Sequence, residues 1–362
     1  MAYNLASMTV KVRSFAKINL GLRIGGARED GFHELLTIYQ TIGLHDVISV
    51  SVNSGRGIEI RCVDPRVPND ESNTCYRIVE KAMRALKAKG RVVVDIEKRL
   101  PVQGGMGGAS SNAVAAMLAL ERVMKKSLPA GERLRIAGEV GSDLPLFLVG
   151  GTVLGVGRGE QVYPLEDWPR TACVVVTPEV GVSTPKAFAD WDRIMKGSAA
   201  DQLARARLRP AGQPRACPAL AEGAAVPTRT SSAKLTMAGA SDRMTELGRA
   251  LSAWLSKRYS GAPRSERGRA ENLLLELVRA GIKNDFEEVV FPDYPELSEG
   301  KCALERAGAK YASLSGSGST LYGLFASQGT ARAAVKKLRG HEWAAQATGT
   351  LTRREYWKRI FV

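Results

Sequence analysis

The sequence has few of the residues that build disulfide frameworks and zinc sites. Five cysteines are scattered over 362 residues without a C-x-x-C pair, and the chain has only three histidines. This scarcity argues against a disulfide-stapled fold and against a structural zinc centre. Unpaired cysteines are typical of a reducing compartment, so we expect a cytoplasmic protein.

Long apolar runs are also missing. No stretch approaches the roughly 18 consecutive apolar residues of a membrane-spanning helix, and the N-terminal residues lack the apolar core of a signal peptide. We therefore expect a soluble protein that is not exported and has no membrane partner. The G-K-[ST] signature is absent as well, which excludes a P-loop, and no internal repeat is visible.

Acidic residues are outnumbered. The chain holds 37 Asp and Glu against 52 Lys and Arg, for a formal net charge of +15. Such a balance suits an anionic partner: nucleic acid, an acidic membrane surface or a phosphorylated metabolite. The excess is local, because residues 191–270 contain fifteen basic residues against six acidic ones.

Residues 196–270 are rich in Ala, Arg, Ser, Pro and Gly, and we interpret them as a basic insertion with one helical stretch near 244–255. A nucleic-acid-binding module would interleave its basic residues with aromatic ones. The basic region offers only Trp191, Trp254 and Tyr259. A solvated insertion is thus the better interpretation, and we expect no nucleic-acid partner.

Alternating hydrophobicity marks several strands. Residues 10–24 are apolar at nearly every even position, which predicts a half-buried strand with Lys17 and Asn19 side by side on its non-core face. Residues 47–52 and 58–62 flank a Gly- and Ser-rich turn and predict a hairpin.

The rest of the chain interleaves helices and strands. We predict a helix over 72–89 ended by Gly90, a strand over 92–96, helices over 113–126 and 131–139, a hairpin around 157–160, a strand over 173–176, a helix over 184–194, and strands over 312–314 and 321–325. Because hairpins recur among the helices, the predicted class is α+β and not a doubly wound parallel sheet.

A glycine-rich loop precedes one of these helices. Residues 101–112 read P-V-Q-G-G-M-G-G-A-S-S-N and run into an apolar helix. Free backbone N–H groups and the positive end of a helix dipole make such a loop an anion cradle. A tight turn or close packing explains a glycine run equally well. The loop lies too far along the chain for a dinucleotide-binding fold.

The combination of motifs is more specific than any one of them. A-K-I-N-L at 16–20, D-G-F-H-E at 30–34, the glycine loop, G-S-D-L-P-L-F-L at 141–148 and S-G-S-G-S at 315–319 stand in this order. Together they closely resemble the 4-diphosphocytidyl-2-C-methyl-D-erythritol kinases, members of the GHMP kinase superfamily. The resemblance covers residues 9–190 and returns from 271 to about 327.

This resemblance implies a two-domain α+β GHMP kinase fold with an active-site cleft between the domains. Residues 1–170 would form the N-terminal domain, with the ATP loop and the catalytic residues. Residues 171–362 would form the C-terminal domain, which carries the basic insertion at about 196–270.

The implied reaction is transfer of the γ-phosphoryl group of ATP, with Mg²⁺, to a hydroxyl of 4-diphosphocytidyl-2-C-methyl-D-erythritol in the non-mevalonate isoprenoid pathway. Two alternatives stay open. One is another GHMP small-molecule kinase of the mevalonate or homoserine type, and the other is a catalytically silent nucleotide-binding protein of this fold. A monomer and a homodimer are both compatible with the sequence.

The resemblance assigns roles to particular residues. Asp143 would be the base that takes the hydroxyl proton, with Lys17 as its partner. Without the resemblance, a helix N-cap would be the better interpretation of Asp143, and a surface lysine would explain Lys17 equally well. The ATP-binding set would be Gly104, Gly105, Met106, Gly107, Gly108, Ser110 and Ser111, with Asn73 and Lys98 near the adenine. Ser111 or its neighbour would contact the metal ion.

The substrate-binding set implied by the resemblance is Asn19, Phe32, His33 and Phe188. Phe32 and Phe188 match rings that stack on cytosine, and His33 matches a histidine that hydrogen-bonds it. Core packing of the rings and a purely structural histidine are the alternatives. Phe32 stands where the family usually has tyrosine, but a ring suffices for stacking.

Two departures concern the glycine loop. Gln103 and Ala109 stand where glycine is common in the family. If either residue has a positive φ, the substitution costs about 1 kcal/mol or more.

Overall fold

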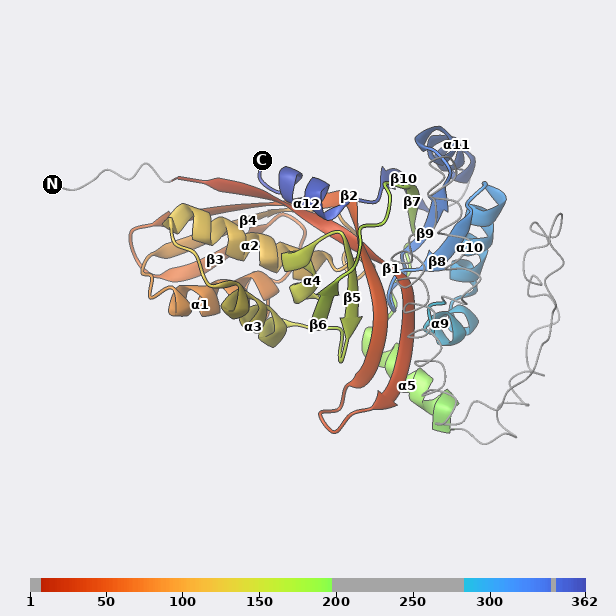
Figure 1. Cartoon of the computed structure of the whole chain (residues 1–362), viewed down its shortest axis with the longest axis horizontal. Helices are drawn as coiled ribbons and strands as arrows, with labels where there is room; N and C mark the ends of the chain where they lie inside the picture. The colour runs from red at the N-terminus through yellow and green to blue at the C-terminus, as the bar shows by residue number, and fades with distance from the viewer. Residues whose placement is uncertain (1–7, 197–282, 340–342) are drawn as a thin grey trace, which may run out of the picture. The chain divides into compact units, whose positions relative to one another are not determined.

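The structure is a computed structural model that describes residues 8–196, 283–339 and 343–362 (Figure 1). Nearly all of the predicted insertion at 196–270, with its helical stretch at 244–255, lies outside these residues. Within the described ranges, no helix has the length and apolar character that crossing a membrane requires.

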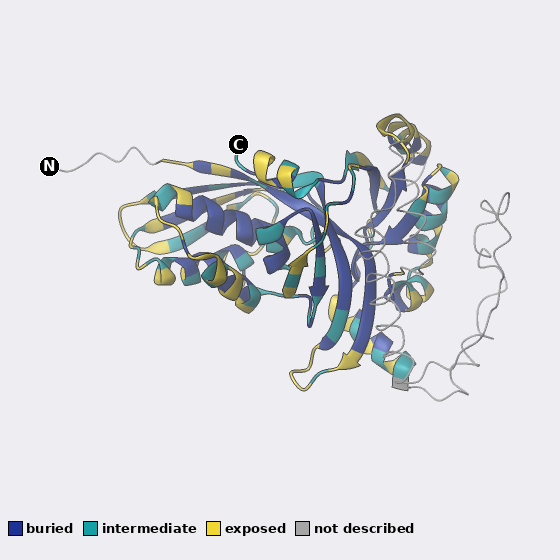
Figure 2. Cartoon of the chain, in the orientation of Figure 1, coloured by how far each residue is buried: buried dark blue, intermediate teal, exposed yellow. Residues whose placement is uncertain are grey.

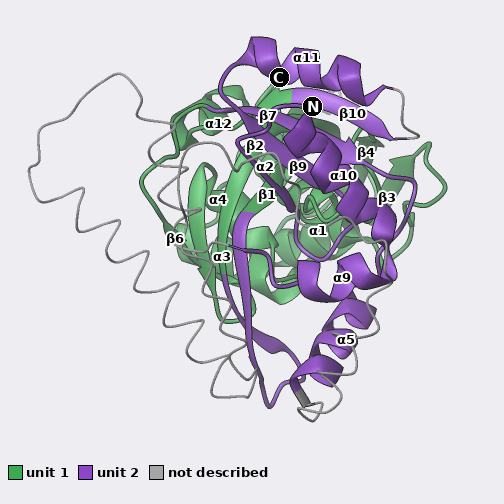
Figure 3. Cartoon of the chain, turned by 90° about the vertical axis from the view of Figure 1, so that its right-hand side faces the viewer, with its two compact units in different colours: residues 1–19, 37–170, 348–362 green, residues 20–36, 171–347 purple. Residues whose placement is uncertain are grey.

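The chain divides into two compact units, each with its own apolar core (Figure 3). Unit 1 comprises residues 1–19, 37–170 and 348–362, and unit 2 comprises residues 20–36 and 171–347. The predicted boundary at residue 170 puts residues 20–36 in the N-terminal domain and residues 348–362 in the C-terminal domain. The structure groups residues 20–36 with unit 2 and residues 348–362 with unit 1. Neither segment could be placed from sequence order, because each one packs with residues far from it along the chain.

Unit 1 is built on a sheet in the order β3-β4-β2-β5-β6, with β1 also paired to β2. Its strands are β1 (Val10–Ala27), β2 (His33–Asn53), β3 (Gly57–Cys62), β4 (Arg91–Glu97), β5 (Thr152–Val156) and β6 (Gln161–Pro164), of which β1 and β2 continue into unit 2. Its helices are α1 (Thr74–Ala85), α2 (Gly108–Met124), α3 (Ala130–Val140), α4 (Leu144–Val149) and α12 (Arg353–Arg359).

The predicted hairpin between β2 and β3 is wrong. Strand β4 lies between them, antiparallel to β2 and parallel to β3. Helix α1 provides the crossover that adjacent parallel strands require. Val92, Val93 and Val94 of β4 are all buried, so both faces of this strand are covered, as suits a central position. The turn between β2 and β3 carries no information about a strand that arrives later in the chain.

The alternating hydrophobicity of residues 10–24 predicts a half-buried strand. Strand β1 is instead buried on both faces over most of its length. Every residue from 14 to 25 is buried, and β1 is dark blue over most of its length in Figure 2. Lys17 and Asn19 keep only 3% and 1% of their surface exposed. The non-core face is therefore covered as well, by polar partners that are described below.

The helix predicted over 72–89 ends earlier, at Ala85, with Leu86 as its C-cap. Gly90 is not the cap. Its φ is +148°, and a Cβ there would lie 2.5 Å from Cγ1 of Val52, so glycine is needed where β4 enters beside β2. The predicted strand over 92–96, the helix over 131–139 and the hairpin around 157–160 are confirmed as β4, α3 and β5–β6. Helix α2 begins at Gly108, before its predicted start.

Unit 2 contains a four-stranded sheet in the order β10-β7-β9-β8. Its strands are β7 (Ala172–Thr177), β8 (Tyr311–Leu314), β9 (Leu321–Phe325) and β10 (Ala344–Gly349), and its helices are α5 (Thr184–Lys196), α9 (Glu287–Asp293), α10 (Pro295–Arg306) and α11 (Gln328–Leu338). In the described part of unit 2, the predicted strands over 173–176, 312–314 and 321–325 and the predicted helix over 184–194 are confirmed, as is the α+β class.

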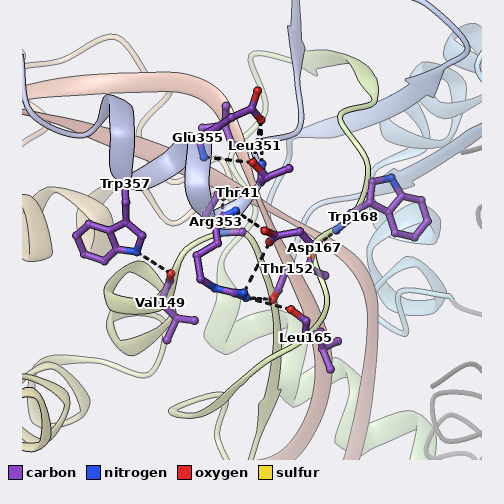
Figure 4. A network of polar contacts seen from close by, with 12 residues as sticks. Thr41, Val149, Thr152, Leu165, Asp167, Trp168, Leu351, Arg353, Glu355 and Trp357 are labelled. Carbon is purple, nitrogen blue, oxygen red and sulfur yellow. Dashed lines mark hydrogen bonds and ion pairs between the residues drawn. The ribbon is translucent and has the colours of Figure 1, made fainter. Parts of the chain in front are cut away.

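The C-terminal segment of unit 1 is tied to β5 through Arg353 (Figure 4). The guanidinium donates to the carbonyl oxygens of Thr152 at 2.9 Å and Leu165 at 3.1 Å. The backbone N–H of Arg353 donates to the carboxylate of Asp167 at 2.9 Å. One side chain thus donates to two carbonyls, of which that of Thr152 also accepts from the backbone N–H of Leu165 at 3.1 Å.

Helix α12 also holds the end of α4. Tyr356 Oη donates to the carbonyl of Phe147 at 2.7 Å, and Trp357 Nε1 donates to that of Val149 at 3.0 Å. Gly150 has a φ of +69°, and a Cβ there would lie 2.4 Å from the Tyr356 ring. The last carbonyls of α4 therefore find partners in α12, which is what a short helix needs at its end.

We expect Arg353→Ala to lower the free energy of unfolding by about 1.5 to 3 kcal/mol, because it removes charged donors from two carbonyl oxygens. Arg354→Ala is the matched control, since Arg354 is the next residue and is exposed. Urea unfolding of both variants measures the difference. Equal midpoints for the two would show that the Arg353 contacts add nothing to stability.

Candidate active site

Polar side chains gather on the buried face of β1 in unit 1. Lys17 Nζ donates to Asn19 Oδ1 at 2.7 Å, and Asn19 Nδ2 donates to Thr37 Oγ1 at 2.8 Å. Lys17 and Asn19 are two residues apart in a strand and so share a face. Their predicted pairing is confirmed. The surface alternative for Lys17 is wrong, because the side chain is buried.

Asp143 stands at the N-cap position of α4, but its side chain makes no capping hydrogen bond. Its Oδ2 lies 3.5 Å from Lys17 Nζ, and its Oδ1 accepts a hydrogen bond from Tyr39 Oη at 3.0 Å. About a third of the side chain, 32%, is exposed. The carboxylate therefore faces a lysine and a tyrosine and does not act as a helix cap.

Burial shapes the ionisation of the groups around Asp143. It lowers the pKa of Lys17, and the attraction of the Asp143 carboxylate only partly offsets this effect. Burial and the same carboxylate raise the pKa of Tyr39 well above its usual value. Tyr39 thus stays protonated and donates. The sequence analysis did not identify Thr37 and Tyr39 as site residues. The signal that could have indicated them is their spacing, because residues two positions apart lie on the same face of a strand.

The glycine loop is held next to Lys17. The backbone N–H of Lys17 donates to the carbonyl of Met106 at 3.0 Å. Gly107 has a φ of +66°, and a Cβ there would lie 3.0 Å from the Phe147 ring and 3.1 Å from Cγ of Lys17. Gly105 also has a positive φ, of +75°. Met106 is buried, with 2% of the residue exposed.

Of the two residues that replace a common glycine, Gln103 and Ala109, only Gln103 has a positive φ. Gln103 has a φ of +60°, in the left-handed region, whereas Ala109 lies in helix α2 with an ordinary helical backbone. The cost of about 1 kcal/mol for a side chain at positive φ therefore falls on Gln103 alone.

Ser110 and Ser111 lie in the first turn of α2. The hydroxyls of Ser14 and Ser111 are 2.8 Å apart, and Ser14 Oγ is 2.6 Å from Asn112 Oδ1. An amide oxygen only accepts, so Ser14 gives its proton to Asn112 and Ser111 gives its proton to Ser14. The Ser111 oxygen then presents lone pairs, as a cation ligand must. The described residues hold no cluster of three or more His, Cys, Asp or Glu that could bind a metal ion.

Asn73 caps helix α1. Its Oδ1 accepts from the backbone N–H of Cys75 at 2.8 Å, and its Nδ2 donates to the carbonyl of Pro68 at 2.6 Å. Both polar ends of the side chain are thus engaged within unit 1. Its contact with adenine stays a prediction.

Lys98 is paired with a fully buried carboxylate. Its Nζ donates to Asp46 Oδ2 at 2.7 Å, and Asp46 Oδ1 accepts from the backbone N–H groups of Arg99 and Leu100, both at 2.7 Å. A Cβ at Gly108 would lie 3.5 Å from Lys98 Nζ, so the ammonium lies beside the first turn of α2. Asp46, which sequence analysis missed, holds the stem of the glycine loop.

The predicted base-binding residues lie in unit 2. The rings of His33 and Phe188 are stacked, with centroids 4.9 Å apart and 13° between their planes. His33 Nε2 lies 2.7 Å from Asp192 Oδ1. Phe188 and Asp192 are four residues apart on α5 and so share one helix face. Phe32 is 49% exposed, so core packing does not explain it. Asp192 was not predicted.

Comparison with known proteins identifies the family. Residues 73–151 match the GHMP kinases N terminal domain, and residues 268–343 match the GHMP kinases C terminal domain. A 4-diphosphocytidyl-2-C-methyl-D-erythritol kinase of Solibacter usitatus is 36% identical over 314 residues, which are 87% of this chain and 80% of the relative. The chain belongs to the 4-diphosphocytidyl-2-C-methyl-D-erythritol kinase family of GHMP kinases.

Solved structures agree with this family. A crystal structure of a 4-(cytidine 5'-diphospho)-2C-methyl-D-erythritol kinase superposes with a TM-score of 0.63 at 26% identity, covering 94% of this chain and 98% of that one. A homoserine kinase from Cytophaga hutchinsonii, at 17% identity and a TM-score of 0.62 over 97% of both chains, shares the fold. The two-domain GHMP kinase fold is confirmed.

The family models cover the candidate residues unevenly. The N-terminal GHMP model spans the glycine loop and Asp143, whereas Lys17 and His33 lie outside both models. The roles of Lys17 and His33 in this member of the 4-diphosphocytidyl-2-C-methyl-D-erythritol kinase family stay predictions.

We expect Asp46→Ala to destabilise this kinase by about 3 to 5 kcal/mol, because it leaves a buried ammonium and two backbone N–H groups without their acceptor. Asp46→Asn, which keeps an acceptor but not the charge, should fall between the wild type and the alanine variant. Denaturant unfolding gives the values.

Asp95→Ala is the control for this pair of variants. Asp95 lies on the adjacent strand β4 with 52% of its side chain exposed and a long 4.0 Å ion pair to Arg61. A loss in Asp46→Ala no larger than in Asp95→Ala would mean that the buried carboxylate does not support the loop stem.

Proposed function

We propose that the protein transfers the γ-phosphoryl group of ATP to a hydroxyl of 4-diphosphocytidyl-2-C-methyl-D-erythritol. The observation that carries the proposal is that Lys17, which is ion-paired with Asp143 at 3.5 Å, is also hydrogen-bonded through its backbone to the glycine loop. Phosphoryl transfer needs a group that positions the attacking hydroxyl and donors that surround the phosphates. Unit 1 has both within one cluster.

Asp143 is the residue suited to take the hydroxyl proton. Its Oδ1 is engaged by Tyr39, so Oδ2 is the oxygen that would accept the proton. The hydroxyl oxygen would bond to the γ-phosphorus as the bond from phosphorus to the bridging oxygen breaks, and ADP would leave. General-base assistance of this kind is worth roughly 10²- to 10⁴-fold in rate. The Lys17 ammonium would stabilise the negative charge that develops on the attacking oxygen and the transferred phosphoryl group.

The glycine loop and the start of α2 are suited to hold the triphosphate. Backbone N–H groups at a helix N-terminus point at a bound anion, and the helix dipole favours negative charge. Mg²⁺ bound with ATP would neutralise charge on the phosphates. The hydroxyl oxygen of Ser111 is a hard oxygen ligand of the kind that such an ion takes, beside water and phosphate oxygens.

Unit 2 is suited to recognise the cytosine. A carboxylate only accepts, so His33 donates from Nε2 to Asp192, and an imidazole that carries its one proton there has Nδ1 as an acceptor. The exocyclic amino group of cytosine is a donor, whereas uracil has an acceptor at that position. The exposed ring of Phe32 can stack on the base. Phe188 supports the His33 ring, and its own stacking on the base stays a prediction.

A coupled ADP-release assay tests the proposal. The purified chain is offered 4-diphosphocytidyl-2-C-methyl-D-erythritol, mevalonate and homoserine in parallel, with ATP and Mg²⁺. Turnover of the cytidylyl substrate alone is expected. Preference for mevalonate or homoserine would favour another GHMP kinase activity, and no turnover of any of them would favour a silent nucleotide-binding protein.

Asp143→Asn is expected to lower turnover by roughly 10²- to 10⁴-fold while ATP binding is kept, because the base is lost and the glycine loop is left intact. Steady-state kinetics and calorimetric titration with ATP measure the two effects. Asp95→Asn, at an exposed position, serves as the control. Turnover above about a tenth of the wild type would remove Asp143 from the chemical step.

His33→Ala is expected to raise the KM for the cytidylyl substrate roughly 10- to 100-fold, because a hydrogen bond to a base edge is worth about 1 to 3 kcal/mol. The KM for ATP should stay within two-fold, and discrimination against the uridine analogue should fall. His45→Ala, a histidine of unit 1, is the control. A parallel rise of both KM values in His33→Ala would point to a folding defect.

A further inference from the structure

Tyr39 contacts both Asp143, the proposed base, and its partner Lys17. Its ring lies on β2 with only 2% of the residue exposed. Its Oη donates to Asp143 Oδ1 at 3.0 Å, and Lys17 Nζ lies 5.6 Å from the centre of its ring. An ammonium within about 6 Å of an aromatic face is attracted by the ring. One side chain therefore touches the carboxylate and the ammonium together.

The β5–β6 hairpin leaves space for this tyrosine. Gly155 pairs with Thr37 on the neighbouring strand, and a Cβ at Gly155 would lie 2.4 Å from Cε2 of Tyr39. Gly159 has a φ of +99°, and a Cβ there would lie 2.5 Å from the Tyr39 hydroxyl and 4.0 Å from Asp143 Oδ1. Any larger residue at these two positions would move the ring or its hydroxyl.

The Tyr39 hydroxyl serves as a hydrogen-bond donor to Asp143. Burial and the nearby Asp143 and Glu160 carboxylates raise the pKa of Tyr39, so the phenol keeps its proton at neutral pH. It then donates to Oδ1 and holds the plane of the carboxylate. This leaves Oδ2, on the Lys17 side, as the oxygen that can receive a proton.

We propose that Tyr39 is a positioning residue that orients the Asp143 carboxylate, and that Gly155 and Gly159 of the β5–β6 hairpin keep the space for it. Tyr39 takes no proton from the substrate and gives none up. The inference rests on the proposed function, because it concerns how Asp143 receives the hydroxyl proton.

Tyr39→Phe removes the hydroxyl and keeps the ring that faces Lys17. We expect kcat to fall roughly ten-fold, the size of one lost hydrogen bond to a charged group, with both KM values within two-fold of the wild type. The acidic limb of the kcat–pH profile should move to higher pH, because the lost donor favoured the charged carboxylate. A purely structural role for Tyr39 would leave that limb in place.

Tyr163→Phe is the matched control, since Tyr163 lies on β6 of the same hairpin and is 53% exposed. It should leave kcat and the pH profile unchanged. Gly159→Ala should reproduce the Tyr39→Phe profile with Tyr39 still present, because the added methyl group displaces the hydroxyl. Thermal unfolding of each variant shows whether the fold is kept.

A spectroscopic readout separates this inference from the proposed function. In the full-length protein labelled with ¹³C at Asp carboxyl carbons, the resonance assigned through Asp143→Asn should titrate at higher pH in Tyr39→Phe than in the wild type. An unchanged titration, or a kcat equal to that of Tyr163→Phe, would overturn the role of Tyr39. A wild type that does not phosphorylate the cytidylyl substrate would overturn the proposed function, and the titration would still decide the role of Tyr39.

Discussion

A buried ammonium beside a half-buried carboxylate is the interaction on which the rest of unit 1 depends. Burial of Lys17 disfavours its charge, so the site needs the acceptors Asn19 and Asp143 and the face of Tyr39 to keep it. Strand β1 brings the lysine, and the start of α4 brings the aspartate. Because α4 is a short helix, its position depends in turn on α12, whose Tyr356 and neighbouring tryptophan bind its last carbonyls.

The glycine loop is placed by the same arrangement and is not an independent motif. Its carbonyl at Met106 binds the backbone of Lys17, and Gly107 allows Phe147 and the lysine stem to approach. At the other end of the loop, Asp46 fixes the two residues that precede it. The positive φ of Gln103 is kept at a small cost because both ends of the loop are held.

Unit 2 follows the same design with different chemistry. The imidazole ring of His33 is held by the Asp192 carboxylate at one nitrogen and by the Phe188 ring against its face. Asp192 and Phe188 stand one helical turn apart on α5, so a single helix face supplies both supports. In each unit, a polar group proposed to act on a ligand is hydrogen-bonded by a second polar group, Asp143 by Tyr39 and His33 by Asp192.

Local patterns determined most of the elements and the motifs that mark the family, because periodicity, glycine loops and cap signals act over a few residues. The sequence could not determine whether Asp143 caps a helix or faces Lys17, since the same G-S-D segment suits both. It also missed Tyr39, Asp46 and Asp192, whose hydrogen bonds join residues 104, 52 and 159 positions apart. Only the tertiary structure decided these contacts, the burial of both faces of β1 and the place of β4, because each one depends on which distant segment covers a given face.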